Sequence, residues 1–137
     1  MKKTLVFGAI LFSMVAFGQK KTIVLNKVGN DKDAHGCKGS AGYTYSQIKH
    51  DCIRTFDQKI KLKEVKPAGT ATFMSSVIFS KDMKQAEIFL PSVKSGSMIL
   101  TRQAKTNNWK NGSYILESYQ KDRYRLKKDN KTIYEQM

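Results

Sequence analysis

The sequence predicts a mainly β fold: a small antiparallel barrel or sandwich of about eight strands, with one short disulfide-clasped helix. Three observations carry this prediction. Apolar and polar residues alternate through most of the chain after residue 56, the pattern of strands that turn one face to a core. Turn-forming residues separate these runs at short intervals, as in a β-meander. The only two cysteines, Cys37 and Cys52, enclose a segment with helical spacing.

Eight runs are predicted as strands. They are residues 20–26, 56–65, 72–80, 86–90, 98–100 and 114–116, with two more around residues 124–126 and 133. Asn111-Gly112 is the most specific turn signal, because both residues tolerate the positive φ of a type I′ hairpin turn. A break at Pro67 separates residues 20–66 from the meander of residues 67–137. Neither part has enough apolar residues for a core of its own, so we expect one domain over residues 20–137.

The N-terminus has the features of a signal peptide over residues 1–19. A positive start is followed by an apolar run over residues 5–17 and by small residues suited to cleavage. The run is too short to span a bilayer, and the first cysteine, Cys37, is too far away for a lipobox. We therefore expect a periplasmic or secreted protein, a monomer with no transmembrane segment.

The chain is strongly basic, with 25 Lys and Arg against 11 Asp and Glu and a net charge of +14. Loss of Lys2 and Lys3 with the signal peptide would lower this to +12. Such a charge favours acidic partners, and we expect a protein or an anionic glycan at the bacterial envelope, with no nucleic acid. The basic residues are dispersed along the chain, which also fits a surface that is lysine-rich for solubility alone.

Export favours a disulfide between Cys37 and Cys52. The loop it closes spans about 15 residues, which is worth roughly 3 kcal/mol in the chain-entropy model. Inside it, residues 39–42 suit a tight turn. Tyr45, Ile48 and Cys52 then follow at i, i+3 and i+7, which predicts a two-turn helix with these side chains on one face.

No metal or cofactor is predicted. Asp31, Asp33 and His35 are the remaining metal candidates, because residues 31–36 resemble the start of a calcium loop. Gly42 stands where such a loop needs a bidentate glutamate, and paired cysteines leave too few ligands for zinc. The chain also lacks a nucleophile elbow, a phosphate-binding loop and a dinucleotide fingerprint, so we do not expect an enzyme.

Trp109, Lys110 and Asn111 form the candidate binding site. They stand in a polar stretch at the predicted hairpin turn, where an exposed indole beside a cation suits a binding hot spot or a sugar-stacking platform. The alternative is a tryptophan that folds back to close the end of the barrel.

The stretch from Val77 to Tyr134 resembles the membrane-bound and periplasmic inhibitors of c-type lysozyme. The features that carry the resemblance are residues 86–90, 98–100 and 109–112, with the closing runs 124–126 and 132–134. The resemblance implies an eight-stranded antiparallel barrel in an exported bacterial protein. The segment GCKGSAGYTYSQIKHDCIR also resembles uncharacterised exported proteins of Gram-negative bacteria.

These observations predict an exported, envelope-associated binding protein without catalysis. Two roles are open: an inhibitor of an envelope-attacking hydrolase that uses the Trp109 hairpin, or a binder of anionic envelope polymers through a basic face. A small secreted hydrolase remains as a residual alternative.

Overall fold

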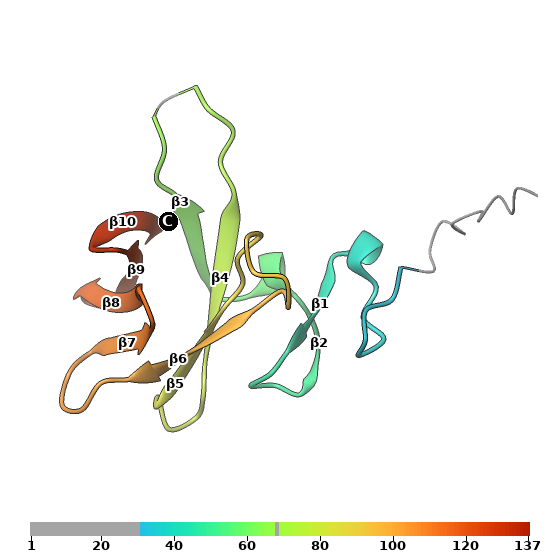
Figure 1. Ribbon diagram of the computed structural model, residues 1–137, viewed down its shortest axis with the longest axis horizontal. Helices are drawn as coiled ribbons and strands as arrows, with labels where there is room; N and C mark the ends of the chain where they lie inside the picture. Colours follow the sequence, from blue (N-terminus) through green and yellow to red (C-terminus); the bar gives the residue numbers. More distant parts are fainter. Residues whose placement is uncertain (1–30, 68) are drawn as a thin grey trace, which may run out of the picture.

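The fold is described from a computed structural model, which covers residues 31–67 and 69–137 (Figure 1). The predicted signal peptide (1–19) and the predicted first strand (20–26) lie outside the described residues. None of the helices within the described residues is long and apolar enough to cross a membrane.

Eight strands form a closed antiparallel barrel in the order β10-β3-β4-β5-β6-β7-β8-β9. The chain therefore runs up and down around the barrel, and β10 closes it by pairing with β3. The strands are β3 (Ile60–Glu64), β4 (Met74–Phe79), β5 (Gln85–Ile88), β6 (Met98–Arg102), β7 (Asn108–Asn111), β8 (Tyr114–Gln120), β9 (Arg123–Lys128) and β10 (Lys131–Gln136). The predicted mainly β fold is confirmed, and of the two predicted architectures the structure is a barrel.

Alternation along the strands places apolar side chains inside the barrel, because successive residues of a strand point to opposite faces. The core contains Leu62, Val77, Ala86, Ile88, Leu90, Leu100, Trp109, Leu116, Leu126 and Tyr134. Side chains from every strand of the barrel thus fill its interior, as expected for eight strands.

The predicted break at Pro67 is the loop between β3 and β4, so the barrel contains chain from both sides of it. β7 was not predicted as a strand, because its sequence Asn-Trp-Lys-Asn has little β-propensity. The strand forms because it pairs with β6 and β8 on its two sides.

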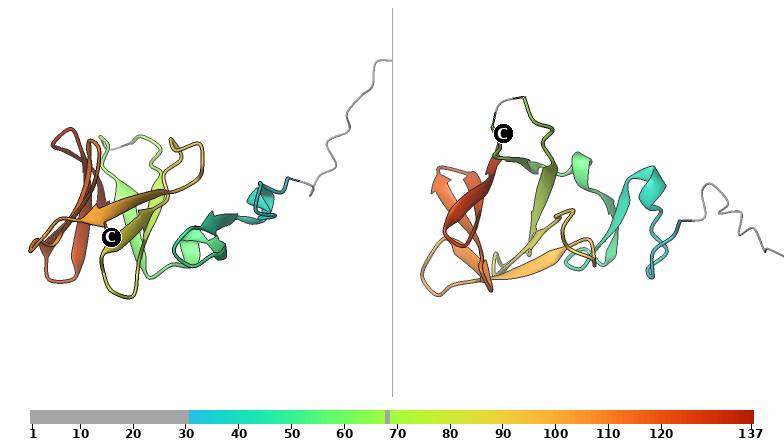
Figure 2. Two further views of the ribbon diagram at one scale, coloured as in Figure 1. Left: turned by 60° about the horizontal axis from the view of Figure 1, so that its bottom comes forward. Right: turned by 45° about the horizontal axis from the view of Figure 1, so that its top comes forward.

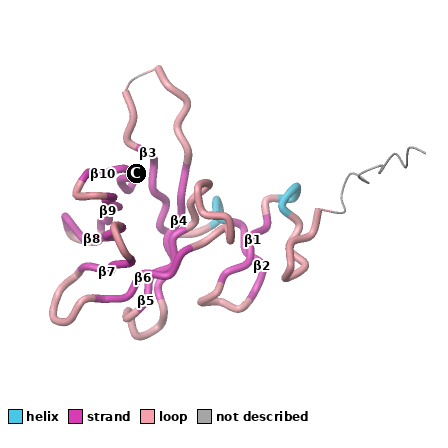
Figure 3. The backbone as a smooth tube through the Cα atoms, in the orientation of Figure 1, coloured by secondary structure: helices cyan, strands magenta, loops and turns pink. Residues whose placement is uncertain are grey.

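The predicted helix at Tyr45–Cys52 is wrong. The segment is a two-stranded hairpin, β1 (Tyr43–Ser46) and β2 (Asp51–Arg54), in which Tyr45 pairs with Cys52. Two turns of helix are marginal in water, whereas aromatic and β-branched residues favour strands. His50 adopts a positive φ of 52° in the connecting loop, a conformation that no helix interior accepts. The hairpin lies outside the barrel (Figures 1 and 3).

The disulfide between Cys37 and Cys52 is confirmed, with a Cα–Cα distance of 5.5 Å. It joins the segment before the hairpin to β2. The predicted tight turn is also confirmed as the 3₁₀ helix η1 (Gly39–Ala41), which ends at Gly42. Gly42 has a φ of 81°, and a Cβ there would lie 2.8 Å from the ring of Phe56, so another residue would strain the backbone and displace this ring.

A short 3₁₀ helix, η2 (Thr55–Asp57), leads from the hairpin into the barrel. The hairpin packs on the outer face of β4 and β5, where Ile53 contacts Ile78 and Phe89 in a second, smaller core. This contact makes the hairpin part of the same folded unit as the barrel.

Glu87 fixes the hairpin loop to the barrel. It points outward from β5, yet it is completely buried beneath the loop. Its carboxylate accepts hydrogen bonds from the hydroxyls of Ser46 (2.7 Å) and Ser97 (2.6 Å) and from the backbone N–H groups of Gln47 (2.8 Å) and Ile48 (3.2 Å). Within the described residues no cation forms an ion pair with it. Each of the two carboxylate oxygens therefore accepts two hydrogen bonds.

Candidate binding site at the basic end of the barrel

The expected exposure of Trp109 is wrong: only 2% of the residue is accessible to solvent. Its ring contacts Phe79 and Tyr124, with centroid distances of 4.8 and 6.0 Å. Its indole N–H donates to the backbone carbonyl of Met83 at 2.8 Å, which satisfies the polar atom of a buried tryptophan. The alternative placement, folded back to close an end of the barrel, is the one observed.

Lys110 and Asn111 do not join Trp109 in one site. Lys110 follows Trp109 in β7 and is exposed, so it lies on the outer face. The Asn111 amide donates to the carbonyl of Ile99 at 2.8 Å and thereby extends the pairing of β7 with β6. The three predicted site residues therefore do not form one binding site.

The predicted hairpin turn is present, but its two-residue loop is Gly112-Ser113 and not Asn111-Gly112. Asn111 pairs with Tyr114, so Gly112 and Ser113 form the two-residue loop. Gly112 has a φ of 57°, whereas Asn111 and Ser113 do not take a positive φ. A positive φ at the first loop residue alone is typical of type II′ rather than type I′.

The metal candidates Asp31, Asp33 and His35 are used within their own segment. Asp31 accepts from the hydroxyl and the backbone N–H of Ser40, and the Ser40 hydroxyl, followed by its N–H, lowers the pKa of Asp31 below its ordinary value of 3.8. Asp33 accepts from the backbone N–H groups of His35 and Cys37. The described residues contain no group of three or more His, Cys, Asp or Glu that could hold a metal ion.

The serine hydroxyls near the two histidines donate to carboxylates. Ser46 and Ser97 bond to Glu87. His35 stacks on Tyr45 with a centroid distance of 3.7 Å, and both rings line a shallow hollow of about 460 Å³ that His50 and Ser97 share. Ser46, Ser97 and Glu87 are all buried, so these hydroxyls serve to bind the carboxylate inside the fold.

Three turns meet at one end of the barrel, which we call the basic end. In an up-and-down barrel every second connection lies at the same end, so the β4–β5, β6–β7 and β8–β9 connections are neighbours. The β4–β5 turn and the β6–β7 loop lie at the bottom of Figure 1. The exposed cations in or next to these three connections are Lys81, Lys84, Arg102, Lys105, Lys121 and Arg123.

The turns of the basic end rest on a rigid aromatic floor. Phe79, Trp109 and Tyr124 are in mutual contact beneath them, and the Trp109 bond to Met83 fixes the β4–β5 turn. The Arg102 backbone N–H donates to the carbonyl of Lys84 at 2.8 Å, which joins this turn to β6. The floor therefore fixes the backbone of the turns from which the cations project.

Arg102 is the most firmly placed cation of the basic end. Its Nε donates to the carbonyl of Thr106 at 2.9 Å, and one terminal nitrogen donates to the Asn107 side chain at 3.1 Å. The guanidinium lies 5.8 Å from the centre of the Trp109 ring, within the range of a cation–π contact. Its remaining N–H groups are the ones that a bound anion could use.

Two carboxylates, Asp82 and Asp122, lie among these six cations. The hydroxyl of Ser80 and then the backbone N–H of Lys84 hold the pKa of Asp82 below its ordinary value of 3.8. The three ion pairs of the described residues all involve Glu64 or Glu117, so neither carboxylate pairs with a cation of this end. The basic end therefore keeps an excess of positive charge.

No protein-family model matches the chain, and neither a curated protein nor a solved structure gives a match.

Proposed function

We propose that this protein is a non-catalytic binding protein of the cell envelope that holds anionic polymers at the basic end of its barrel. The observation that carries the proposal is the convergence of six exposed cations from three turns onto one rigid end, with two carboxylates among them. The disulfide supports an oxidising compartment, in which phosphorylated or acidic glycans would be partners of suitable charge.

A polymer suits the basic end better than a small ligand. Two strands separate each connection of the basic end from the next one in the sequence. The cations are therefore spread over the end of the barrel and do not line an enclosed pocket. Repeated negative charges along a chain can meet several such cations at once, and each additional contact adds affinity. Arg102 offers a fixed fork for a sulfate, phosphate or carboxylate group.

Inhibition of a lysozyme-like hydrolase stays a prediction from the sequence resemblance. The insertion of Trp109 into an enzyme cleft is not part of our proposal, because the indole is in the barrel core. A lysozyme activity assay with the protein in excess tests inhibition independently of polymer binding.

The proposal is tested with dextran sulfate as the probe and uncharged dextran as its control, by calorimetry. The variant Lys84→Gln/Lys105→Gln/Lys121→Gln removes one cation from each turn. At about 1 kcal/mol per lysine at an anionic surface, we expect affinity to fall by about 100-fold.

The matched control is Lys32→Gln/Lys38→Gln/Lys131→Gln, which removes the same charge from exposed positions outside the basic end. It should keep affinity within a few-fold of the wild type. Equal losses in the two variants would show that net charge alone binds the polymer and would refute a site at the basic end.

A further inference from the structure

The opposite end of the barrel presents apolar side chains to solvent. The connection from β3 to β4 is longer than the turns of the basic end and projects from the barrel at the top of Figure 1 and in the right view of Figure 2. The described residues include five exposed large hydrophobic residues, which are Phe56, Val65, Phe73, Met74 and Met137. Val65, Phe73 and Met74 belong to this projecting hairpin.

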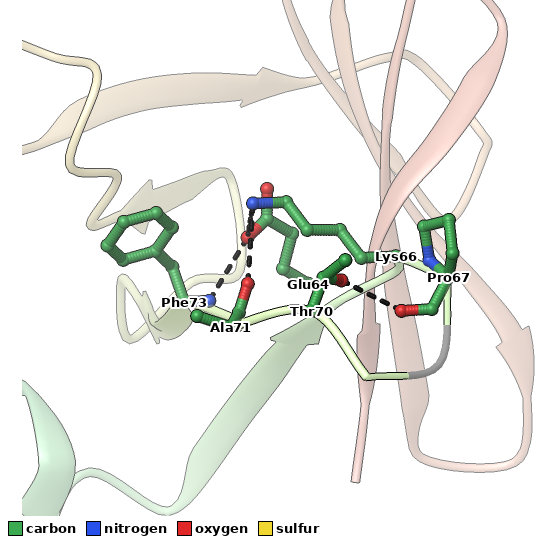
Figure 4. Close-up of polar contacts among 6 residues, drawn as sticks. All are labelled: Glu64, Lys66, Pro67, Thr70, Ala71 and Phe73. Carbon is green, nitrogen blue, oxygen red and sulfur yellow. Dashed lines mark hydrogen bonds and ion pairs between the residues drawn. The ribbon is translucent and has the colours of Figure 1, made fainter.

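The hairpin is held in its extended form by its own polar contacts (Figure 4). The Glu64 carboxylate accepts from the backbone N–H of Phe73 at 3.0 Å, and Lys66 pairs with the same carboxylate at 3.1 Å. The Lys66 ammonium also lies 5.2 Å from the centre of the Phe73 ring. These contacts hold Phe73 beside Glu64 and Lys66, and 55% of it remains exposed.

The apolar residues occupy both faces of the hairpin. Met74 pairs with Lys63 in the β3–β4 ladder, and Phe73 bonds to Glu64 one position further along. Adjacent residues of a strand point to opposite faces, so Phe73 and Met74 point away from each other. A flat protein surface would cover only one of these side chains, whereas a lipid interface can surround both.

The charge of the hairpin complements an anionic lipid surface. Lys61, Lys63 and Lys66 flank the apolar residues, and the sequence has no carboxylate between Glu64 and Asp82. Glu64 is paired with Lys66, which leaves Glu135, opposite Lys63 on β10, as the neighbouring acid. Apolar side chains beside lysines are the combination that binds the interface of anionic membranes.

We infer that the β3–β4 hairpin docks on an anionic lipid surface. Phe73, Met74 and Val65 enter the boundary between headgroups and acyl chains, and Lys61 and Lys63 contact lipid phosphates. This surface lies at the end of the barrel away from the proposed polymer site, so the two ends would bind different envelope components at the same time.

The test places a fluorescent reporter in the hairpin of the full chain. Phe73→Trp is mixed with vesicles of phosphatidylglycerol and phosphatidylcholine that carry bromine on their acyl chains, and with brominated vesicles of phosphatidylcholine alone. Bromine quenches only a tryptophan that enters the bilayer, so the apolar run at residues 5–17 cannot produce the signal. We expect several-fold stronger quenching with the anionic vesicles.

Tyr119→Trp, on β8 away from the hairpin, is the matched reporter control and should not be quenched. Adding Lys61→Gln/Lys63→Gln to Phe73→Trp should reduce the quenching several-fold, whereas adding Lys84→Gln/Lys105→Gln should not. Absence of quenching at position 73, or equal quenching at position 119, would overturn the inference. Dextran sulfate binding is measured separately, so either proposal can fail without the other.

Discussion

The two ends of the barrel use their aromatic residues in opposite ways. At the basic end, Trp109 is 2% exposed and packs against Phe79 and Tyr124. At the other end, Phe73 is 55% exposed and contacts the ammonium of Lys66. Trp109 stands between two polar residues and Phe73 stands beside the apolar Met74, yet Trp109 is the buried residue and Phe73 the exposed one.

The difference follows from where each residue stands relative to the closed part of the barrel. Trp109 lies in β7 and pairs with Leu116 of β8. Paired residues of neighbouring strands point to the same face of a sheet, so both side chains enter the interior. Phe73 comes just before β4, beyond the paired region that ends at Lys63 and Met74. The two aromatic residues therefore have different energetic roles, and mutations should separate them.

The largest effect is expected for Trp109→Ala. Removing a buried indole leaves a cavity and an unsatisfied Met83 carbonyl, so the free energy of unfolding should fall by about 3–5 kcal/mol. Phe73→Ala should change it by no more than about 0.5 kcal/mol. Urea denaturation measures both, and similar losses at the two positions would abolish the distinction between the two ends.

The next effect concerns the hairpin outside the barrel, which belongs to neither end. Replacing Cys37 and Cys52 together by serine removes a link with a sequence separation of 15 and should cost about 3 kcal/mol. Both ends should remain intact, so dextran sulfate should still bind to the folded variant. Titration of the wild type with a thiol reagent should find no free thiol; two reactive thiols would contradict the disulfide.

Glu87→Gln should lower the free energy of unfolding by about 2 kcal/mol, because a carboxamide nitrogen would face donors that now bond to a carboxylate. Glu135→Gln, at an exposed position on β10, is the control and should have almost no effect. Amide hydrogen exchange should be faster at Gln47 and Ile48 in the Glu87 variant. Unchanged exchange there would mean that Glu87 does not hold the hairpin loop.

The smallest effect is the pH dependence of stability. Burial by itself raises the pKa of Glu117, but hydrogen bonds and charge from Lys127 and Arg125 outweigh it and leave the pKa below its ordinary value of 4.5. A carboxyl group whose pKa is lower in the folded state stabilises the fold above its unfolded pKa and loses that contribution as pH falls through the folded value.

Stability should therefore decline below about pH 4.5, by no more than about 1 kcal/mol from the Glu117 pairs. Urea denaturation at pH 7 and at pH 3 measures the decline, and Glu117→Gln should reduce it. An increase in stability between pH 4.5 and pH 3 would contradict this direction.

Much of the barrel could be predicted from the sequence, because alternation and turn chemistry are local signals. Ile88, Leu100, Leu116 and Leu126 all occur in runs predicted from alternation, and all four are buried. The Asp129-Asn130 connection also follows its sequence, with φ values of 50° and 63°, as a type I′ turn requires.

The hairpin and the basic end could not be predicted in the same way. Ile48 has helical spacing to Tyr45 and Cys52, but its backbone N–H is held by Glu87, which lies 39 residues away in sequence. The cations of the basic end come from turns that only the up-and-down order brings together. In a predicted meander, alternate turns lie at the same end of the barrel. This rule could have identified the cations of the basic end from the sequence.

Lysine acetylation with and without dextran sulfate tests the central claim, the polymer site at the basic end, most directly. Mass spectrometry of the modified protein reports the protection of each lysine by the bound polymer. We predict several-fold protection of Lys81, Lys84, Lys105 and Lys121, with Lys38, Lys131 and Lys61 modified as in the free protein. Equal protection of all these lysines, or protection centred on Lys61, would contradict a polymer site at the basic end.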